Sequence, residues 1–422
     1  MRSLLPAEMR SLWEPKLRLY FLASLLGTLG FGLSMVLMVV YLHDIRHLSI
    51  PFATGLLSIN AIVLLLVSPL SGSLTDRFGP TAVFLVWTLV HAVALVSFAF
   101  ADNVVWIVIS SITMAASDGA MWGPGQTLLA RLAGPERRQN AYGVNFMLVN
   151  VGVGVGGLVS AVVVNLHDPA TFTALYLGTA VLTLAMAIPI WMLRSDGGAI
   201  EHEDPTAVGD RTGWHEVVRD RRLQRFMIAV LVLLTCGYGS LDAGFSLFVV
   251  NEVHLSLNVV GITLLCNTVA IVIGQLFVLR WLAGKSRSGA LALVAIIWAL
   301  AWAVVAVAPH VISAVALPLL CVAMVIFAAG ETIWSPVGPA LVNEIAPEHL
   351  RGRYNAAFGL TFGLSGVMGP LVAGALLGSS IAAAWPLVVG AGALVGCLLA
   401  LSLRRHLTPV EDGRVTAVEG AA

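Results

Sequence analysis

Long apolar segments separated by short polar breaks recur along almost the whole 422-residue chain. A hydrocarbon core about 30 Å thick requires about 20 consecutive apolar residues in one spanning helix. Twelve segments of that length can be marked out, six on each side of one long polar segment. The pattern therefore predicts an all-α membrane protein with twelve transmembrane helices. The expected helices are 19–42, 53–72, 80–101, 104–131, 139–165, 171–193, 223–250, 256–282, 287–308, 312–342, 353–378 and 381–403.

The long polar segment, residues 195–220, is rich in Asp, Glu and Arg and contains no apolar run of spanning length. We interpret it as a linker between two halves of the protein. The expected organisation is an N-terminal six-helix bundle over 1–194, a cytoplasmic linker over 195–220, a C-terminal six-helix bundle over 221–404 and a cytoplasmic tail over 405–422.

An internal repeat supports the division into halves. Trp122-Gly123-Pro124 is followed, eleven residues after its proline, by Pro135-Glu136, and Trp334-Ser335-Pro336 is followed at the same interval by Pro347-Glu348. Both copies continue into a basic segment and an Asn-Ala pair. Parallel repeats of six helices are typical of transporters whose two halves rock about a central substrate site.

Composition agrees with a lipid environment, because 58% of the residues are hydrophobic and 11% are charged, whereas soluble proteins carry about 25% charged residues. Basic and acidic residues balance at 23 each, so net charge indicates no nucleic-acid partner. The four cysteines all lie inside apolar segments, which argues against a disulfide framework or a metal cluster. They are Cys236, Cys266, Cys321 and Cys397.

The basic residues are distributed unevenly between the loops. If the N-terminus is inside, every Lys and Arg except Arg46 falls on the cytoplasmic side or at a helix end that faces it, as the positive-inside rule requires. The first apolar segment, 19–42, is longer than a signal-peptide core and lacks a cleavage pattern after it, so we expect it to remain as a helix. The expected location is the cytoplasmic (inner) membrane, with both termini in the cytoplasm.

Between the second and third expected helices the chain reads Gly72-Ser73-Leu74-Thr75-Asp76-Arg77-Phe78-Gly79-Pro80. This segment resembles the signature loop of the major facilitator superfamily, in which Gly, three residues, Asp-Arg, one residue and Gly follow one another. Pro80 and Thr81 stand where that family usually has basic residues. Glycines allow close helix approach, and a carboxylate beside a helix N-terminus and an Arg can latch two helices together. Gly72, Asp76, Arg77 and Gly79 are therefore the expected conformational latch.

Glycines also recur in the expected fifth and eleventh helices. Within that family resemblance they look like the glycine-rich fifth-helix motif of drug:proton antiporters, although the first copy lacks the usual proline. Small residues let membrane helices approach closely. The expected packing residues are Asn150, Gly152, Gly156, Gly157, Gly369 and Pro370. The resemblance implies the major facilitator fold, two pseudo-symmetric six-helix bundles.

No motif indicates an enzyme. Gly152, Gly154 and Gly157 match the spacing of a dinucleotide-binding fingerprint, but they lie inside a membrane span instead of after a strand. Gly284-Lys285-Ser286 lacks the first glycine of a phosphate-binding loop. A metalloprotease His pair and a G-x-S-x-G elbow are also absent from the sequence.

Three acidic residues lie at membrane depth: Asp118 near the middle of the fourth helix, Glu331 in the tenth and Asp242 in the outer half of the seventh. A charge at the bilayer centre costs at least about 2.5 kcal/mol, so such residues face a bundle interior or water and are candidates for proton coupling. A structural role, as protonated acids hydrogen-bonded to a neighbouring helix, is the alternative. Residues near these acids could line a hydrophobic cavity or pack against neighbouring helices. They are Met114, Met121, Trp122, Tyr238, Phe245 and Trp334.

No Lys or Arg lies comparably deep, which argues against strongly anionic substrates. Ala115 replaces the fourth-helix arginine that is usual in drug:proton antiporters, which leaves Asp118 as a possible substitute. The leading hypothesis is a monomeric, proton-coupled exporter of lipophilic or cationic small molecules that works by alternating access. It would need no cofactor beyond the proton gradient, and its partners would be substrate, protons and the lipid bilayer. An uptake permease for a sugar or peptide, or a non-transporting membrane receptor, are the alternatives.

Overall fold

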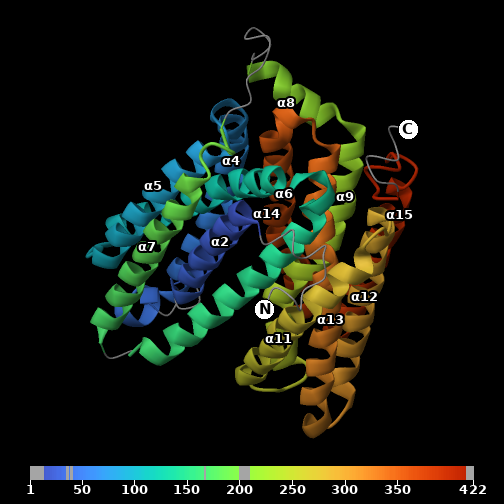
Figure 1. Cartoon of the computed structure of the whole chain (residues 1–422). Helices are drawn as coiled ribbons and strands as arrows, with labels where there is room; N and C mark the ends of the chain where they lie inside the picture. Colours follow the sequence, from blue (N-terminus) through green and yellow to red (C-terminus); the bar gives the residue numbers. More distant parts are fainter. Residues whose placement is uncertain (1–13, 35–37, 39–40, 166–167, 199–209, 415–422) are drawn as a thin grey trace. The chain divides into compact units, whose positions relative to one another are not determined.

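The computed structural model describes residues 14–34, 38, 41–165, 168–198 and 210–414. Within these ranges all regular secondary structure is helical, which confirms the predicted all-α fold (Figure 1). Parts of several expectations lie outside the described residues: positions 35–37 and 39–40 of the first helix, 199–209 of the linker, 415–422 of the tail, and the basic residues Arg2 and Arg10. The long helices are α2 (Pro15–Ser34), α4 (Ile50–Phe78), α5 (Pro80–Phe100), α6 (Val104–Val163), α7 (Pro169–Met192), α9 (Arg221–Leu234), α11 (Leu257–Leu282), α12 (Arg287–Val307), α13 (Ser313–Ile345), α14 (Arg351–Leu377) and α15 (Trp385–Leu403).

Shorter helical segments connect the long ones. Two consecutive π-helical segments, η5 and η6, extend α9 into α10, and a separate helix, α8, lies within the predicted linker. The bounds of these segments are η3 (Tyr41–Ile45), α8 (Asp210–Arg219), η5 (Thr235–Gly239), η6 (Leu241–Phe245), α10 (Ser246–Asn251), η7 (Ala308–His310), η8 (Glu348–Leu350) and η9 (Ala382–Ala384).

Eleven helices in the described part of the chain are long and apolar enough to cross a membrane. One of them, α6, has 60 residues, which would measure about 90 Å at 1.5 Å per residue, three times the hydrocarbon thickness. Gly134 interrupts it with φ 69° and ψ 169°, a conformation open mainly to glycine. Residues 104–133 and 135–163 are therefore two membrane helices, and this break accounts for the twelfth predicted helix.

The break in α6 has a counterpart in the second copy of the repeat. In the first copy the chain breaks at Gly134, directly before Pro135. In the second copy α13 ends at Ile345 and α14 begins at Arg351, with Pro347 between them. The two Trp-x-Pro segments thus lie on helices that end at equivalent places, as the sequence repeat predicted.

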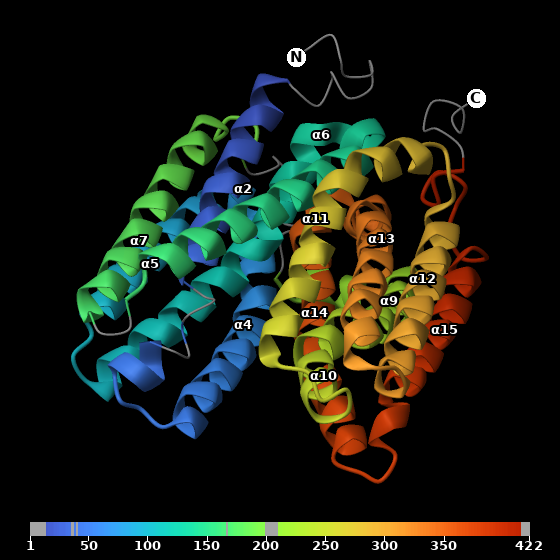
Figure 2. The same cartoon turned by 90° about the horizontal axis from the view of Figure 1, so that it is seen from below.

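The helices fall into two compact units. The first unit comprises residues 1–214 and 346–359, and the second comprises 215–345 and 360–422. In the first unit α6 packs against α2, α4 and α5, and α7 packs against α2 and α5 (Figure 2). In the second unit α12 packs against α13 and α15, and α11 packs against α13. The beginning of α14, although it lies late in the sequence, belongs to the first unit.

Glycines bring helices into backbone contact in both units. A side chain added at Gly152 would overlap the side chain of Thr28, and one added at Gly156 would overlap the backbone oxygen of Leu29. In the second unit, a side chain at Gly369 would overlap the backbone of Gly239. The close helix approach expected from the glycine-rich segments therefore occurs between α6 and α2 and between α14 and η5. Pro370 lies inside α14, Gly157 lies in α6, and Asn150 donates a hydrogen bond to the Phe146 carbonyl of its own helix at 3.0 Å.

The signature segment is helical for most of its length, where a loop was expected. Helix α4 continues to Phe78, so Asp76 and Arg77 lie in its last turn. After Gly72 the segment contains no glycine or proline that could stop the helix before Gly79-Pro80. Gly79 leaves the helix with φ 83°, and Pro80 starts α5, where its fixed φ and missing N–H are tolerated.

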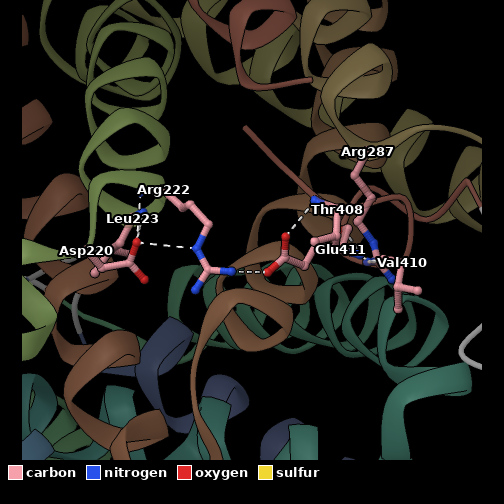
Figure 3. Close-up of polar contacts among 7 residues, drawn as sticks. All are labelled: Asp220, Arg222, Leu223, Arg287, Thr408, Val410 and Glu411. Carbon is pink, nitrogen blue, oxygen red and sulfur yellow. Dashed lines mark hydrogen bonds and ion pairs between the residues drawn. The ribbon is translucent and has the colours of Figure 1, made fainter. Parts of the chain in front are cut away.

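The first residues of the predicted tail fold back onto the second unit after α15 (Figure 3). The Arg222 guanidinium donates to Glu411 Oε1 at 2.5 Å, and Arg287 Nη1 donates to the Glu411 carbonyl at 2.6 Å. Asp412 is fully buried and accepts hydrogen bonds from the Ser288 backbone N–H and the Ser286 hydroxyl. Residues 405–414 are therefore a structured part of this unit.

Candidate functional site

Glu331 is the most enclosed of the three predicted carboxylates. It lies on α13 in the second unit and is 4% exposed. Asn267 Nδ2, on α11, donates to its Oε2 at 2.5 Å, and the Tyr238 hydroxyl forms a second side-chain hydrogen bond with it. Both donors that the described residues bring to this carboxyl are neutral. A charged carboxylate is costly to bury without a cation beside it.

Polar contacts from α11 hold the helix that carries Glu331. Besides Asn267, Gln275 is buried and donates from its Nε2 to the Thr332 carbonyl at 3.1 Å. Asn267 and Gln275 are eight residues apart, about two helical turns, so they lie on the same side of α11. This side of α11 therefore faces α13 at Glu331 and Thr332 and positions the carboxyl.

Aromatic rings surround the second hydrogen-bond donor. Tyr238 lies on η5, and its ring meets Trp298 edge-on at 5.6 Å between centroids. Trp298 stacks on Phe327 at 4.9 Å, and it fits against Gly237 and Gly330, where any side chain would overlap its ring. The glycine on each side thus makes room for the indole that orients Tyr238.

The remaining predicted residues of the second unit lie in different environments. Asp242, on η6, has an exposed side chain and is close enough to interact electrostatically with both Glu331 and Tyr238. Phe245 and Trp334 are buried, at 0% and 2% exposure. The structure thus brings Glu331, Tyr238 and Asp242 together, whereas Phe245 and Trp334 are packed side chains whose contribution to a substrate cavity stays a prediction.

Asp118, in the first unit, faces a histidine that the sequence analysis did not select. His91 Nδ1, on α5, lies 3.5 Å from Asp118 Oδ1 on α6. The side chain of Asp118 is 34% exposed and that of His91 is 12% exposed. The position of His91 in the middle of the very apolar segment 80–100 was the signal available in the sequence, but nothing there shows which helix His91 faces.

The other predicted cavity residues of the first unit differ in their burial and in their contacts. Met114 belongs to the hydrophobic core, together with Phe98 and Ile107. Met121 Sδ lies 3.4 Å from the Thr88 hydroxyl, and Trp122 is 39% exposed. Their roles in substrate binding stay predictions.

Asp76 holds the start of α14. Its Oδ1 accepts a hydrogen bond from the Gly352 backbone N–H at 2.6 Å, and its Oδ2 accepts one from the Arg353 N–H at 3.2 Å. The first N–H groups of a helix have no partner within the helix and favour a negative charge. The Arg353 guanidinium lies 3.6 Å away, whereas the guanidinium of Arg77 lies over the Phe78 ring at 5.0 Å. The arginine beside the carboxylate is thus Arg353, from the segment 346–359.

We expect Asp76→Asn to lower the initial transport rate about tenfold or more while substrate affinity stays within a few fold. The amide removes the negative charge from a helix N-terminus and from Arg353, and hydrogen bonds to charged groups contribute about 1.5–3 kcal/mol each. Glu252→Gln, which neutralises an acid at the end of α10, outside the latch, is the control and should transport normally. Rates and substrate binding are to be compared in proteoliposomes. An unchanged rate in Asp76→Asn would remove the latch from the mechanism.

In the part of the chain that the structure describes, no three or more His, Cys, Asp or Glu side chains are grouped so that they could hold a metal ion. The four cysteines are free thiols.

Repeated sets of apolar helices that enclose carboxylates define a multi-pass membrane transporter. The chain belongs to the Major Facilitator Superfamily, whose family model matches residues 20–283 and 237–421. This confirms the resemblance that the signature segment indicated.

Similar proteins come from bacteria and from humans. The chain is 22% identical over 372 residues to the uncharacterized MFS-type transporter YhjO of Bacillus subtilis (strain 168), covering 88% of this chain and 89% of that protein. It is 22% identical over 394 residues to the quinolone resistance protein NorA of Staphylococcus aureus (strain MSSA476), covering 91% and 95%. The crystal structure of the human organic anion transporter MFSD10 (TETRAN) matches with a TM-score of 0.71 at 15% identity, covering 94% of this chain and 100% of that one. At that identity the last match concerns the fold alone.

Proposed function

We propose that this protein is a proton-coupled exporter of lipophilic or cationic small molecules and that Glu331 carries the coupled proton. The observation that carries the proposal is a buried carboxyl whose hydrogen-bond partners, Asn267 and Tyr238, are both neutral. Loss of hydration favours the protonated form of such a group, and renewed access to water favours release. Similarity to a quinolone resistance protein supports export of drug-like compounds.

The proposed cycle couples protonation to conformational change. Glu331 binds a proton when it is accessible from outside and releases it to the cytoplasm after the protein has changed conformation. A ligand shifts the equilibrium between two conformations only if it binds them with different affinities. The proton meets this condition here because one conformation hydrates the Glu331 carboxylate better than the other. Asp242 can receive the proton first, since its side chain is exposed and close to Glu331. Asp118, which lies 3.5 Å from His91, is a second acid, available for a second proton or for a cationic substrate.

The substrate class follows from charge and surface. The three predicted coupling residues, Glu331, Asp242 and Asp118, are acids, and Tyr238, which contacts Glu331, packs against the Trp298 ring. Aromatic faces and carboxylates attract organic cations, whereas phosphorylated substrates would require Arg or Lys.

The proposal is tested with purified protein in liposomes, across a panel of lipophilic cations, neutral drugs, sugars and peptides. We expect an imposed pH gradient to drive uphill movement of the cationic and lipophilic compounds, with opposing proton flux. Expression in a sensitive host should raise resistance to the same compounds. Movement of a sugar or peptide alone, with growth on that nutrient, would favour an uptake permease. Absence of movement for every solute would favour a receptor.

We also propose that both termini are cytoplasmic and that a monomer suffices, because both halves lie in one chain. In a variant without the natural cysteines, single cysteines at Arg46 and His310 should react with an impermeant maleimide from outside the cell, and one at Arg137 should not. Arg46 and His310 lie after η3 and in η7 respectively, and Arg137 lies just after the break in α6. The opposite labelling would contradict the orientation.

A further inference from the structure

A cavity in the first unit lies where α6 breaks. Its volume is about 460 Å³, and it is lined by residues from both sides of the break, from the turn after α7 and from the segment 346–359. Three of the lining residues are arginines: Arg131, Arg138 and Arg351. These side chains come from well-separated parts of the sequence.

Two of the three arginines are buried and Arg131 is half-buried, which makes their convergence costly. Arg138 is 3% exposed and Arg351 is 9% exposed. Arg351 interacts electrostatically with both Arg138 and Arg131, and each of these interactions is repulsive. Like charges that gather at a partly buried site are unfavourable unless an opposite charge compensates them.

The acids that line the cavity compensate this charge only in part. Asp196 forms an ion pair with Lys16 at 2.5 Å. Glu348 lies 3.7 Å from the Arg351 guanidinium, which is too long for a good hydrogen bond, and its side chain is 68% exposed. Arg131 donates to the Gly198 carbonyl at 2.7 Å, a neutral acceptor. Three arginines and two carboxylates therefore line the cavity, and one of the two carboxylates already pairs with Lys16. Asp76, outside the lining, also interacts electrostatically with Arg131, but it already accepts hydrogen bonds from the start of α14.

The backbone adds to the positive character of the cavity. Gly134 and Pro135 line it, and they are the residues at which the second half of α6 begins. The N-terminus of a helix carries a partial positive charge and N–H groups without helical partners. Gly134 has no side chain that could cap them. Guanidinium groups and a helix N-terminus together are the recurring elements of oxyanion sites.

We propose that this cavity binds a phosphate-type oxyanion, either free phosphate or the phosphate of an anionic lipid headgroup, through Arg131, Arg138 and Arg351. The bound anion links the break in α6 to the segment 346–359 that Asp76 also holds. It therefore stabilises the conformation in which this segment packs on the first unit, and it gives the cell a means of regulating the transporter that is separate from its substrate.

Thermal unfolding of the purified full-length protein in detergent tests the site. One titration uses sodium phosphate at constant ionic strength, and the other uses dihexanoyl-phosphatidylglycerol with dihexanoyl-phosphatidylcholine as the zwitterionic reference. We expect saturable stabilisation by at least one of the two anions. Arg131→Gln and Arg351→Gln should each weaken the apparent affinity about tenfold, equivalent to about 1.4 kcal/mol. Arg137→Gln, next to Arg138 but outside the cavity lining, is the matched control and should bind like the wild type.

A second variant keeps the test decisive if an arginine variant does not fold. Glu348→Gln removes a negative charge from the rim at an exposed position, so it should tighten anion binding. Stabilisation by phosphate alone identifies a free anion as the ligand, and stabilisation by phosphatidylglycerol alone identifies a lipid headgroup; both support the site. Lack of saturable binding of either anion to the wild type, equal binding by all variants, or an equal loss in Arg137→Gln would overturn it.

Discussion

Glu331→Gln is expected to abolish uphill, pH-driven transport while downhill exchange of substrate continues. Glutamine preserves the shape of the protonated acid and can still accept from Asn267, but it cannot release a proton. The coupled rate should fall by about a hundredfold or more, equivalent to about 2.7 kcal/mol. Substrate efflux driven by a pH gradient and substrate exchange without a gradient should be measured on the same proteoliposomes.

The controls separate coupling from folding. Glu252→Gln changes an acid at the end of α10, outside the predicted site, and should behave like the wild type. Asp118→Asn should either lose coupling as well or lose cationic substrates selectively, depending on which role this residue has. Asp242→Asn should slow protonation from outside. If all three neutral variants, Glu331→Gln, Asp118→Asn and Asp242→Asn, are well folded and fully coupled, the carboxylates do not carry the proton.

We expect Gly72→Ala to lower the transport rate more than any other substitution that adds one methyl group to α4. Its Cβ would lie 2.6 Å from the Ala356 Cβ and 2.9 Å from the Gly352 carbonyl oxygen, which is closer than real Cβ contacts. Because backbone atoms cannot rotate away, α4 and the start of α14 must separate, at a cost of about 1–3 kcal/mol. This separation also lengthens the hydrogen bonds of Asp76 to Gly352 and Arg353. Lower thermal stability and a transport rate reduced about tenfold should follow.

Gly55→Ala provides the matched control on the same helix. No atom lies within 4 Å of a Cβ built at Gly55, and alanine favours a helix over glycine by about 0.5–1 kcal/mol. This variant should therefore unfold at the same temperature as the wild type or slightly higher, and it should transport normally. Equal behaviour of Gly72→Ala and Gly55→Ala in unfolding and transport assays would show that the contact between α4 and α14 is unimportant.

The three carboxylates could be found from the sequence because an ionised side chain in an apolar segment is rare and conspicuous. The residues that contact these carboxylates could not be found from the sequence. His91 and Asn267 are polar residues, which membrane helices accommodate at many places, and each contacts an acid of a different helix. Arg77 was chosen for the latch because it adjoins Asp76 in the sequence, whereas the arginine beside the carboxylate is Arg353, 277 residues away.

The sequence by itself determined that the chain is helical, crosses the membrane twelve times and repeats its architecture, because hydrophobic length, charge asymmetry and the Trp-x-Pro repeat are properties of consecutive residues. Only the tertiary structure decided which side chains meet. The short distances from Asp118 to His91, from Glu331 to Asn267 and from Asp76 to the first turn of α14 depend on how helices rotate and pack against one another. Glycines such as Gly152 and Gly72 allow this packing because they let helices from distant parts of the sequence come into contact. The local pattern of hydrophobicity or charge does not show which helices these are.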